Sequence, residues 1–198
     1  RERGFRDAII DKFQLGYCLN QRDAFIQYAM KNGYSKDLLL KIGLASGNEE
    51  RMYDKYQGRV IFPIHNLTGK VIGFGARILS GDKTKAKYLN SPESEIYNKS
   101  QTLYGIYFAK NEISRLDECI LVEGYADVLS MHQAGIENTV ASSGTSLTTE
   151  QIRLISRYTK NITILYDGDN AGIHAALRGT DMILEEGMNV RIVLLPPD

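Results

Sequence analysis

The stretch ITILYDGDNAG, residues 162–172, decides how the rest of the chain is interpreted. Its first five residues are apolar or β-branched, as in a strand buried on both faces. This pattern stops at Asp167-Gly168-Asp169, and a helical pattern follows from Ala171. Open α/β sheets bind ligands at the carboxyl ends of their strands, where two carboxylates would need a countercharge such as a divalent cation. A turn followed by a helix cap explains the same residues equally well.

A second stretch, ECILVEGYAD at residues 118–127, repeats the arrangement of strand, acid, glycine and helix. Glu123 ends the strand, and Asp127 follows one helical turn later on the same face. If the two strands are neighbours, Glu123, Asp127, Asp167 and Asp169 converge. Four acids around one point favour a hard cation with oxygen ligands, which predicts Mg²⁺ or Mn²⁺ in a site that handles phosphates.

Composition indicates a soluble globular protein. Of the 198 residues, 43% are hydrophobic and 24% are charged. No apolar run approaches the roughly 20 residues of a membrane span, and the opening Arg1-Glu2-Arg3 is no signal peptide. Two cysteines cannot form a Cys-rich zinc site, and Cys119 falls in a predicted buried strand, so we expect a reduced, cytoplasmic protein with no membrane contact.

The net charge of zero hides an asymmetry between the two parts of the chain. Residues 1–117 carry 19 Lys and Arg against 13 Asp and Glu, and residues 118–198 carry 5 against 11. A basic part joined to an acidic part suits a polyanion that one part holds and the other processes. Ordinary variation of surface charge could produce the same difference.

Hydrophobic periodicity predicts a different architecture for each part. Residues 1–44 are expected to be helical, with a stop at Leu15-Gly16 and two further short helices at 22–31 and 35–42, the second capped by Ser35. Residues 46–57 are expected to form a loop. A hairpin follows, with strands at 59–64 and 70–79. From residue 103 helices and strands alternate, which predicts a parallel sheet with right-handed crossovers. The expected strands are 119–122, 139–141, 162–166 and 190–195, and the expected helices are 103–115, 125–134, 148–158 and 171–186.

Two segments carry polar groups suited to nucleic acid or phosphate. Residues 87–93 and 97–100 are predicted to be irregular, with Lys side chains for phosphates and Tyr88 and Tyr97 for base stacking. A solvated loop whose tyrosines pack inward is the alternative, and composition alone favours it. Residues 141–146, ASSGTS, could line an anion site or form a plain capping loop.

Five motifs in order extend this interpretation: RVIFPIHNLTGKVIGFGARIL, KYLNSPESEIYNKSQTLYGI, ILVEGYADVLSMHQAGI, ASSGTSLT and ILYDGDNAGIHAAL. Over nearly its whole length the chain resembles the RNA polymerase core of bacterial DNA primase, the DnaG family, including the Toprim domain. The resemblance implies an α/β fold with a basic α+β subdomain at 1–117 and a Toprim subdomain at 118–198. It implies a nucleotidyltransferase, a DNA-directed RNA polymerase that makes short RNA primers from ribonucleoside triphosphates on single-stranded DNA.

The resemblance also implies roles for individual residues. Glu123 matches the Toprim glutamate, Asp167 and Asp169 match the Asp-x-Asp pair, and Asp127 is a further acid. In the two-metal scheme these acids hold the divalent ions. The residues that match positions contacting template or triphosphate are Arg77, Lys87, Tyr88, Asn90, Lys99 and, on a shorter motif, Arg3.

The sequence departs from the family pattern in several places. Ser100 stands where the family has glycine, Ser143 replaces an apolar residue, and the Asp-Pro-Asp motif expected after Pro197 is absent. We also expect this sequence to lack the family's zinc-binding module and the module that contacts the replicative helicase. We therefore expect a monomeric fragment without zinc that binds metal weakly and makes little primer.

Two other functions fit parts of the pattern. Another Toprim activity, such as DNA cleavage or rejoining, would use the same acids, although the nucleophilic tyrosine domain of topoisomerases is not evident. A non-catalytic module could bind single-stranded DNA or nucleotides through its basic part. DNA binding that needs no metal and survives Glu123→Gln would favour this second alternative.

Overall fold

The computed structural model describes residues 4–79, 84–142, 144 and 146–195. The chain forms two compact units, and neither is continuous in sequence. One comprises Arg1–Lys12, His65–Lys70 and Asn98–Asp198, and the other Phe13–Ile64 and Val71–Tyr97. The division into functional subdomains at residues 117 and 118 stays a prediction.

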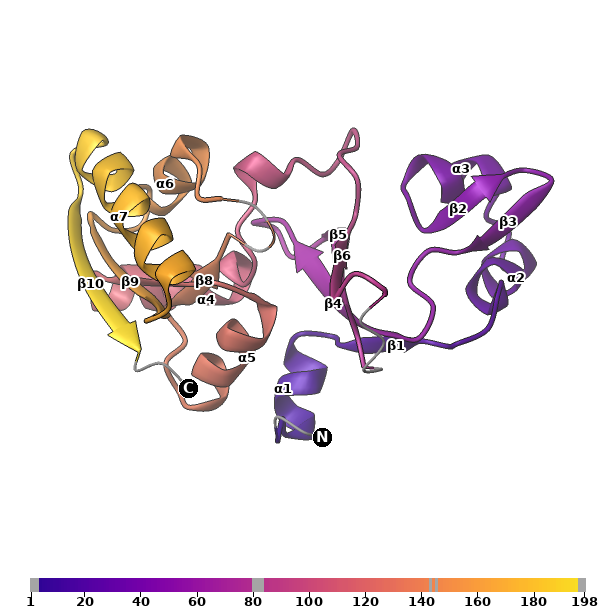
Figure 1. Ribbon diagram of the computed structural model, residues 1–198, viewed down its shortest axis with the longest axis horizontal. Coiled ribbons are helices and arrows are strands. Elements are labelled where there is room, and N and C mark those ends of the chain that lie inside the picture. The colour runs from indigo at the N-terminus through magenta and orange to yellow at the C-terminus, as the bar shows by residue number, and fades with distance from the viewer. Residues whose placement is uncertain (1–3, 80–83, 143, 145, 196–198) are drawn as a thin grey trace. The chain divides into compact units, whose positions relative to one another are not determined.

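The first unit is built on a parallel sheet whose strands have the order β10-β9-β7-β8 (Figure 1). This confirms the α/β prediction and the strands and helices expected after residue 103. The strands are β7 (Cys119–Val122), β8 (Thr139–Ala141), β9 (Asn161–Asp167) and β10 (Asn189–Leu195). The helices are α1 (Asp7–Lys12), the 3-10 turn η1 (Lys99–Gln101), α4 (Ile106–Leu116), α5 (Tyr125–Gln133), α6 (Thr149–Ile155) and α7 (Asn170–Glu185).

Strands β7 and β9 are direct neighbours, as the convergence of the acids requires. Cys119 pairs with Ile162 and Leu121 with Ile164, so these side chains share one face of the sheet. All four are buried in a cluster that also contains apolar residues of α4, α6 and α7. Apolar contact on this face fixes the register, and the register brings the carboxyl ends of β7 and β9 side by side.

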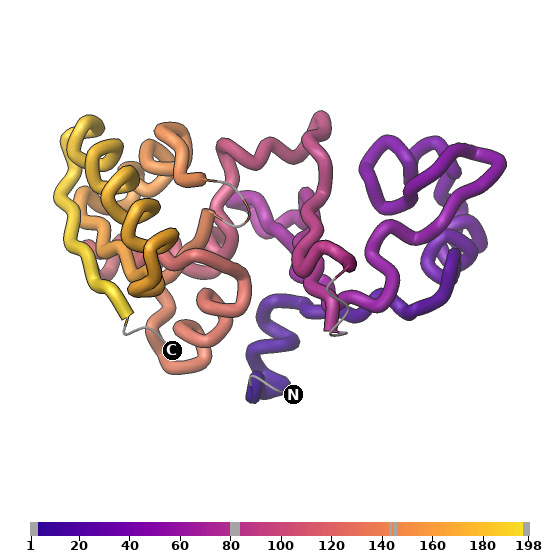
Figure 2. Tube along the Cα trace, in the orientation of Figure 1, coloured from indigo at the N-terminus to yellow at the C-terminus, as the bar shows by residue number. Residues whose placement is uncertain are grey.

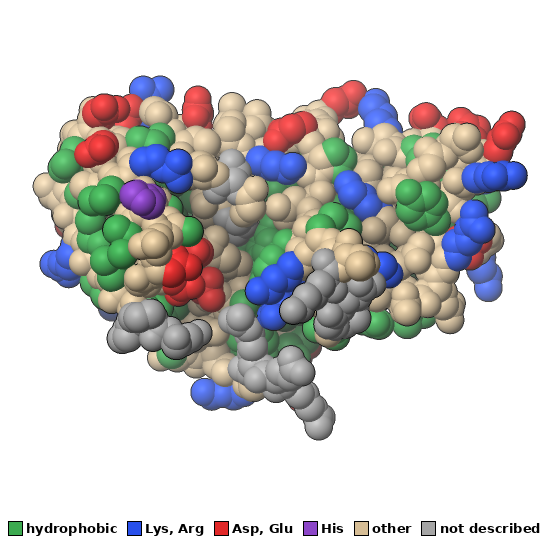
Figure 3. All heavy atoms as spheres, viewed as in Figure 1, with side chains coloured by type: hydrophobic (Ala, Val, Ile, Leu, Met, Phe, Trp, Pro, Cys, Tyr) green, Lys and Arg blue, Asp and Glu red, His purple; other side chains and the backbone are tan. Residues whose placement is uncertain are grey.

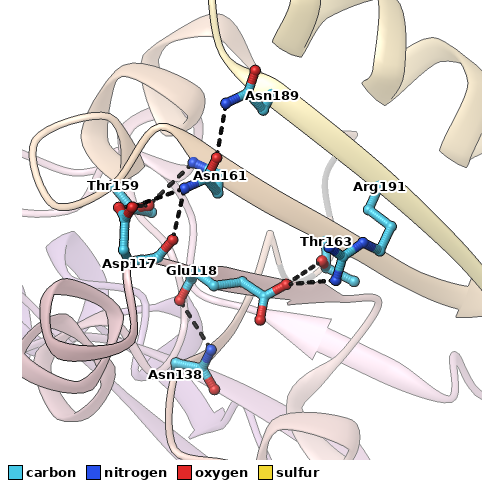
Figure 4. Close-up of polar contacts among 8 residues, drawn as sticks. All are labelled: Asp117, Glu118, Asn138, Thr159, Asn161, Thr163, Asn189 and Arg191. Atoms are coloured by element: carbon cyan, nitrogen blue, oxygen red, sulfur yellow. Dashed lines mark hydrogen bonds and ion pairs between the residues drawn. The ribbon is translucent and has the colours of Figure 1, made fainter.

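Polar side chains join the opposite, amino ends of the same strands (Figure 4). The Asn161 side-chain amide donates to the backbone oxygen of Asp117 at 2.9 Å and to its carboxylate at 3.0 Å, and accepts from Asn189 at 2.8 Å. Thr163 donates to Glu118 at 2.6 Å. The sheet is therefore fixed at this end by directional bonds, which a one-residue slip would break.

Two segments distant in sequence complete this unit. Helix α1 lies beside α5 (Figure 2), where Lys12 pairs with Glu137 at 2.8 Å and the Arg6 amide donates to the Gln133 side chain at 2.8 Å. The turn at residues 65–70 is held by α4, because the Lys110 ammonium donates to the Leu67 carbonyl at 2.6 Å. Both segments are anchored by hydrogen bonds to the sheet's own helices.

The second unit contains a four-stranded sheet in the order β1-β4-β5-β6 and a separate hairpin, β2-β3. The strands are β1 (Gly16–Cys18), β2 (Ala45–Asn48), β3 (Arg51–Asp54), β4 (Arg59–His65), β5 (Val71–Ile78) and β6 (Tyr88–Asn90). The helices are α2 (Ala24–Lys31) and α3 (Lys36–Lys41). The predicted hairpin is confirmed as β4-β5, and Ser35 caps α3 by accepting from the Leu38 amide at 3.2 Å.

The helices expected at 22–31 and 35–42 are confirmed as α2 and α3, and β1 is an additional strand in the break that precedes them. Two predictions for this unit are wrong: residues 46–57 are not a loop, because they contain most of the β2-β3 hairpin, and residues 87–93 include β6. These strands are only three or four residues long, and most of their side chains are exposed or half-exposed. Their alternation is consequently too weak to identify them, and pairing to neighbours decides their structure.

The buried His132 in α5 provides a pH test of this fold. Its Nε2 lies 3.1 Å from the Thr139 oxygen, and burial is the main cause that lowers the pKa of the imidazole from 6.5 to about 4. A histidine with a depressed pKa contributes stability above pH 6.5 that is lost as pH falls toward 4. Between pH 7 and pH 5 we expect the parent to lose roughly 2 kcal/mol more than His132→Gln, measured by urea unfolding. Equal losses would contradict the burial of a neutral imidazole.

Candidate active site

The Asp-Gly-Asp turn joins the end of β9 to the start of α7. Asp167 is the last residue of the strand, and Asp169 is the N-cap of the helix, with its Oδ1 accepting from the Gly172 amide at 2.7 Å. The capping interpretation is therefore correct for Asp169. Capping uses one carboxylate oxygen, so it does not exclude a second role for the other.

Glu123 connects the two strand ends directly. It follows β7, and its Oε1 accepts from the Asp167 amide at 3.0 Å. Partial burial raises the pKa of the Glu123 carboxyl, and the charges of Asp167, Asp127 and Asp169 raise it further, while the Asp167 amide opposes them. The four acids predicted to converge thus lie within electrostatic range of one another, and Figure 3 shows acidic side chains gathered near the start of α7.

Backbone amides hold three of these carboxylates. Besides Glu123 and Asp169, the Asp127 side chain accepts from the Gly124 amide at 3.0 Å at the start of α5. Among the described residues, no group of three or more His, Cys, Asp or Glu side chains is arranged to hold a metal ion. The four carboxylates nevertheless suit a divalent cation, because hard cations bind carboxylate oxygens. Each carboxylate that a backbone amide holds has a second oxygen besides the one that accepts the hydrogen bond.

Gly172 is a site residue that sequence reasoning missed. A Cβ there would lie 2.2 Å from the Asp167 carbonyl oxygen and 3.1 Å from Glu123 Oε1. Only glycine lets the first turn of α7 approach the acids this closely. The available signal was its position three residues after Asp169, where an N-cap carboxylate meets a backbone amide.

Gly172→Ala is expected to destabilise the protein. The added methyl group must displace either the Asp167 backbone or the start of α7, at about 1–3 kcal/mol, although alanine is otherwise the better helix former. Urea unfolding measures the change. Gly179→Ala on the same helix is the control, since its Cβ would meet only side-chain methyl groups at 3.3 and 3.4 Å. Equal stability of the two variants would show that the close approach does not constrain the site.

The predicted basic and aromatic residues form a second group, on β5 and β6. Arg77 and Tyr88 are paired across these strands, and the guanidinium carbon lies 5.9 Å from the ring centroid. Asn90 pairs with Gly75 on the same face, two residues along each strand. Arg77 Nε is buried and has no hydrogen-bond partner within the described residues. Lys87 lies just before β6, with its side chain exposed.

The other residues predicted to contact nucleic acid or triphosphate lie elsewhere in the chain. Lys99 lies in η1 of the unit that contains the acids, and its carbonyl accepts from Gln151 at 3.0 Å. Arg3 lies outside the described residues. Tyr97 is not available for stacking: it is 3% exposed, because its ring packs on Gly73, and burial raises the pKa of its hydroxyl to about 12. For Tyr97 the inward-packing alternative is correct.

The fold and its acids define a Toprim-like domain, and residues 120–198 match the family described as Toprim-like. Residues 1–110 match the family described as DNA primase catalytic core, N-terminal domain. The chain belongs to the DnaG-type DNA primase catalytic core family. The second match begins ten residues after the first has ended, so the two families follow one another along the chain.

Known proteins agree with this assignment. The chain is 43% identical over 196 residues to a DNA primase of Clostridium acetobutylicum, covering 98% of this chain and 32% of that protein. It therefore spans about a third of the length of this relative. The RNA polymerase domain of Mycobacterium tuberculosis primase DnaG superposes with a TM-score of 0.90 at 32% identity, over 99% of this chain and 66% of that one. A DnaG primase catalytic domain bound to single-stranded DNA superposes with a TM-score of 0.88 at 38% identity. This match covers 99% of this chain and 64% of that one.

One finding concerns membranes. Within the described ranges, no helix combines the length and the apolar character needed to cross a bilayer.

Proposed function

We propose that this chain carries the catalytic part of a template-directed RNA primer synthase, acting on single-stranded DNA with ribonucleoside triphosphates. The observation that carries the proposal is the convergence of Glu123, Asp127, Asp167 and Asp169 at the ends of β7 and β9 in a member of the primase family. Divalent Mg²⁺ or Mn²⁺ bound there would neutralise triphosphate charge and stabilise the leaving pyrophosphate.

The chain's own residues divide the work. Glu123 and Asp167 are the expected principal ligands, because no hydrogen bond within the described residues engages Glu123 Oε2 or the Asp167 carboxylate. Asp169 and Asp127 add charge while their caps keep them in place. The capped turns hold these acids rigidly, which favours catalysis because little reorganisation is then needed.

Nucleic-acid contact is proposed for the face of β5 and β6. A guanidinium beside an exposed aromatic ring, with an amide two residues along, combines phosphate binding with base stacking. A similar DnaG catalytic domain has been solved with single-stranded DNA, which supports this assignment. We extend the same role to Lys87, Lys99 and Arg3 because they match basic positions of the family motifs. We also propose that the chain binds the RNA primer and the ribonucleoside triphosphates.

The metal site is tested with Mn²⁺ calorimetry on the parent and on Asp167→Asn/Asp169→Asn. Asparagine caps helices as well as aspartate, so the turn is retained while two charged ligands are lost. We expect at least tenfold weaker binding, about 1.4 kcal/mol. Asp181→Asn, an exposed acid further along α7, is the control and should bind as the parent does. Unchanged binding in the double variant would contradict the metal role of the acidic turn.

The nucleic-acid face is tested by measuring the affinity of Arg77→Gln for single-stranded DNA as a function of salt. Loss of one phosphate contact should weaken binding and reduce the salt slope by about 0.7. Arg51→Gln, on exposed β3 of the same unit, is the matched control. If the salt dependence of DNA binding has the same slope in both variants, Arg77 does not contact a phosphate of the DNA. If the affinity for DNA depends neither on metal nor on the Glu123→Gln substitution, the non-catalytic binding module is favoured instead.

A further inference from the structure

Strand β6 carries two residues of the proposed nucleic-acid face, Tyr88 and Asn90, but few ladder bonds hold it. It is three residues long and lies at the end of the order β1-β4-β5-β6, so β5 is its only neighbour among the described strands. Its side chains are exposed or half-exposed, and three residues is the short end of the usual range for strands. Contacts at the two ends of β6 therefore decide how firmly Tyr88 is held beside Arg77.

The start of β6 is fixed at the carbonyl of Lys87. This oxygen accepts from the Ile78 amide of β5 at 3.0 Å and from the Arg59 guanidinium at 3.3 Å. Arg59 is buried and belongs to β4, the strand on the far side of β5. Its bond consequently ties β6 to a strand with which β6 does not pair.

The end of β6 is fixed by the side chain of Ser91. The Ser91 amide donates to the Phe74 carbonyl at 2.8 Å, as in an ordinary ladder, but the Phe74 amide donates to the Ser91 hydroxyl at 2.9 Å. The hydroxyl thus takes the place of the carbonyl that completes a regular antiparallel pair. The same Ser91 oxygen lies 3.1 Å from the Tyr56 hydroxyl, so the two hydroxyls share a hydrogen bond.

The two hydroxyls cannot reach a ligand on the proposed nucleic-acid face. Successive residues of a strand point to opposite faces, so Ser91 lies on the face opposite to Asn90. Ser91 is 3% exposed and Tyr56 is 4% exposed. Burial raises the pKa of the Tyr56 hydroxyl, while the bond to Ser91 opposes the rise, so the pair is uncharged at neutral pH. These residues can affect nucleic acid only through the strand that they hold.

We propose that Ser91 and Tyr56 are positioning residues for nucleic acid: their shared hydrogen bond fixes the end of β6 and keeps Tyr88 and Asn90 beside Arg77. The inference rests on the proposed function, because it takes the face of β5 and β6 as the surface that binds single-stranded DNA. When the bond is lost, the end of β6 moves away from β5, and Tyr88 loses the orientation in which a base stacks on its ring. Arg77 lies on the longer strand β5 and keeps its phosphate contact.

The test measures the affinity of the full chain for single-stranded DNA as a function of salt. Ser91→Ala should weaken binding about fivefold or more, the smallest loss expected when one base no longer stacks on an aromatic ring. The salt slope should stay that of the parent, because no phosphate contact is lost. Ser91→Thr keeps the hydroxyl and should restore the affinity of the parent. Circular dichroism and thermal unfolding establish that each variant is folded at the temperature of the measurement.

A second variant and two controls isolate the hydrogen bond. Tyr56→Phe removes only the other hydroxyl and should weaken binding by a smaller factor, because the bond from Phe74 to Ser91 remains. The double variant should bind no more weakly than Ser91→Ala alone, since both changes break one bond. Tyr53→Phe, at an exposed tyrosine of β3, should bind as the parent does. Ser35→Ala removes the cap of α3 in the same unit, so it lowers stability and should leave DNA affinity unchanged.

The outcomes separate this inference from the function on which it rests. If Arg77→Gln reduces the salt slope while Ser91→Ala and Tyr56→Phe bind as the parent does, the inference is overturned and the nucleic-acid face survives. Additive losses in the double variant also overturn it, as does equal weakening by Ser35→Ala. A Ser91→Thr variant that is as stable as the parent but binds no better than Ser91→Ala overturns the role of the hydroxyl. A parent that binds no single-stranded DNA refutes the proposed function and the inference with it.

Discussion

The hydrogen bond from the Asp167 amide to the Glu123 carboxylate is the constraint on which the site depends. It spans two adjacent parallel strands at their carboxyl ends, where the ladder bonds of the sheet have run out. Through it, the side chain at the end of β7 orients the backbone of the turn after β9. Glu123 is therefore both a structural link and a candidate metal ligand: its Oε1 accepts the hydrogen bond, and its Oε2 is left for a metal.

Gathering four acids opposes folding, and the local structure offsets part of that repulsion. Each of three carboxylates receives a backbone amide, two of them at the starts of helices where the helix dipole favours negative charge. Burial is the main cause that raises the pKa of Glu123, and the charges of the neighbouring carboxylates raise it further, so part of the repulsion persists. A bound cation would relieve it, so we expect metal binding and folding to reinforce one another in this domain.

The sequence predicts the sheet unit well because its strands are buried and its helices alternate with them regularly. Glu123 and the Asp-Gly-Asp turn were identifiable because acids at strand ends are conspicuous. The short strands β1, β2, β3 and β6 were not, since only their partners define them. Nor was Gly172, because its close approach to the Asp167 carbonyl oxygen is visible only in the tertiary structure.

The anchoring of α1 and of the turn at residues 65–70 also affects how the protein is made. Arg6 finds its partner 127 residues further along the chain and Lys12 finds its partner 125 residues further along. During synthesis, α1 can make these contacts only after α5 and the residues that follow it have emerged from the ribosome. Contacts so distant in sequence slow folding, and the apolar Ile9 would be exposed meanwhile. The unit that contains the acids is thus assembled from segments that are translated far apart in time.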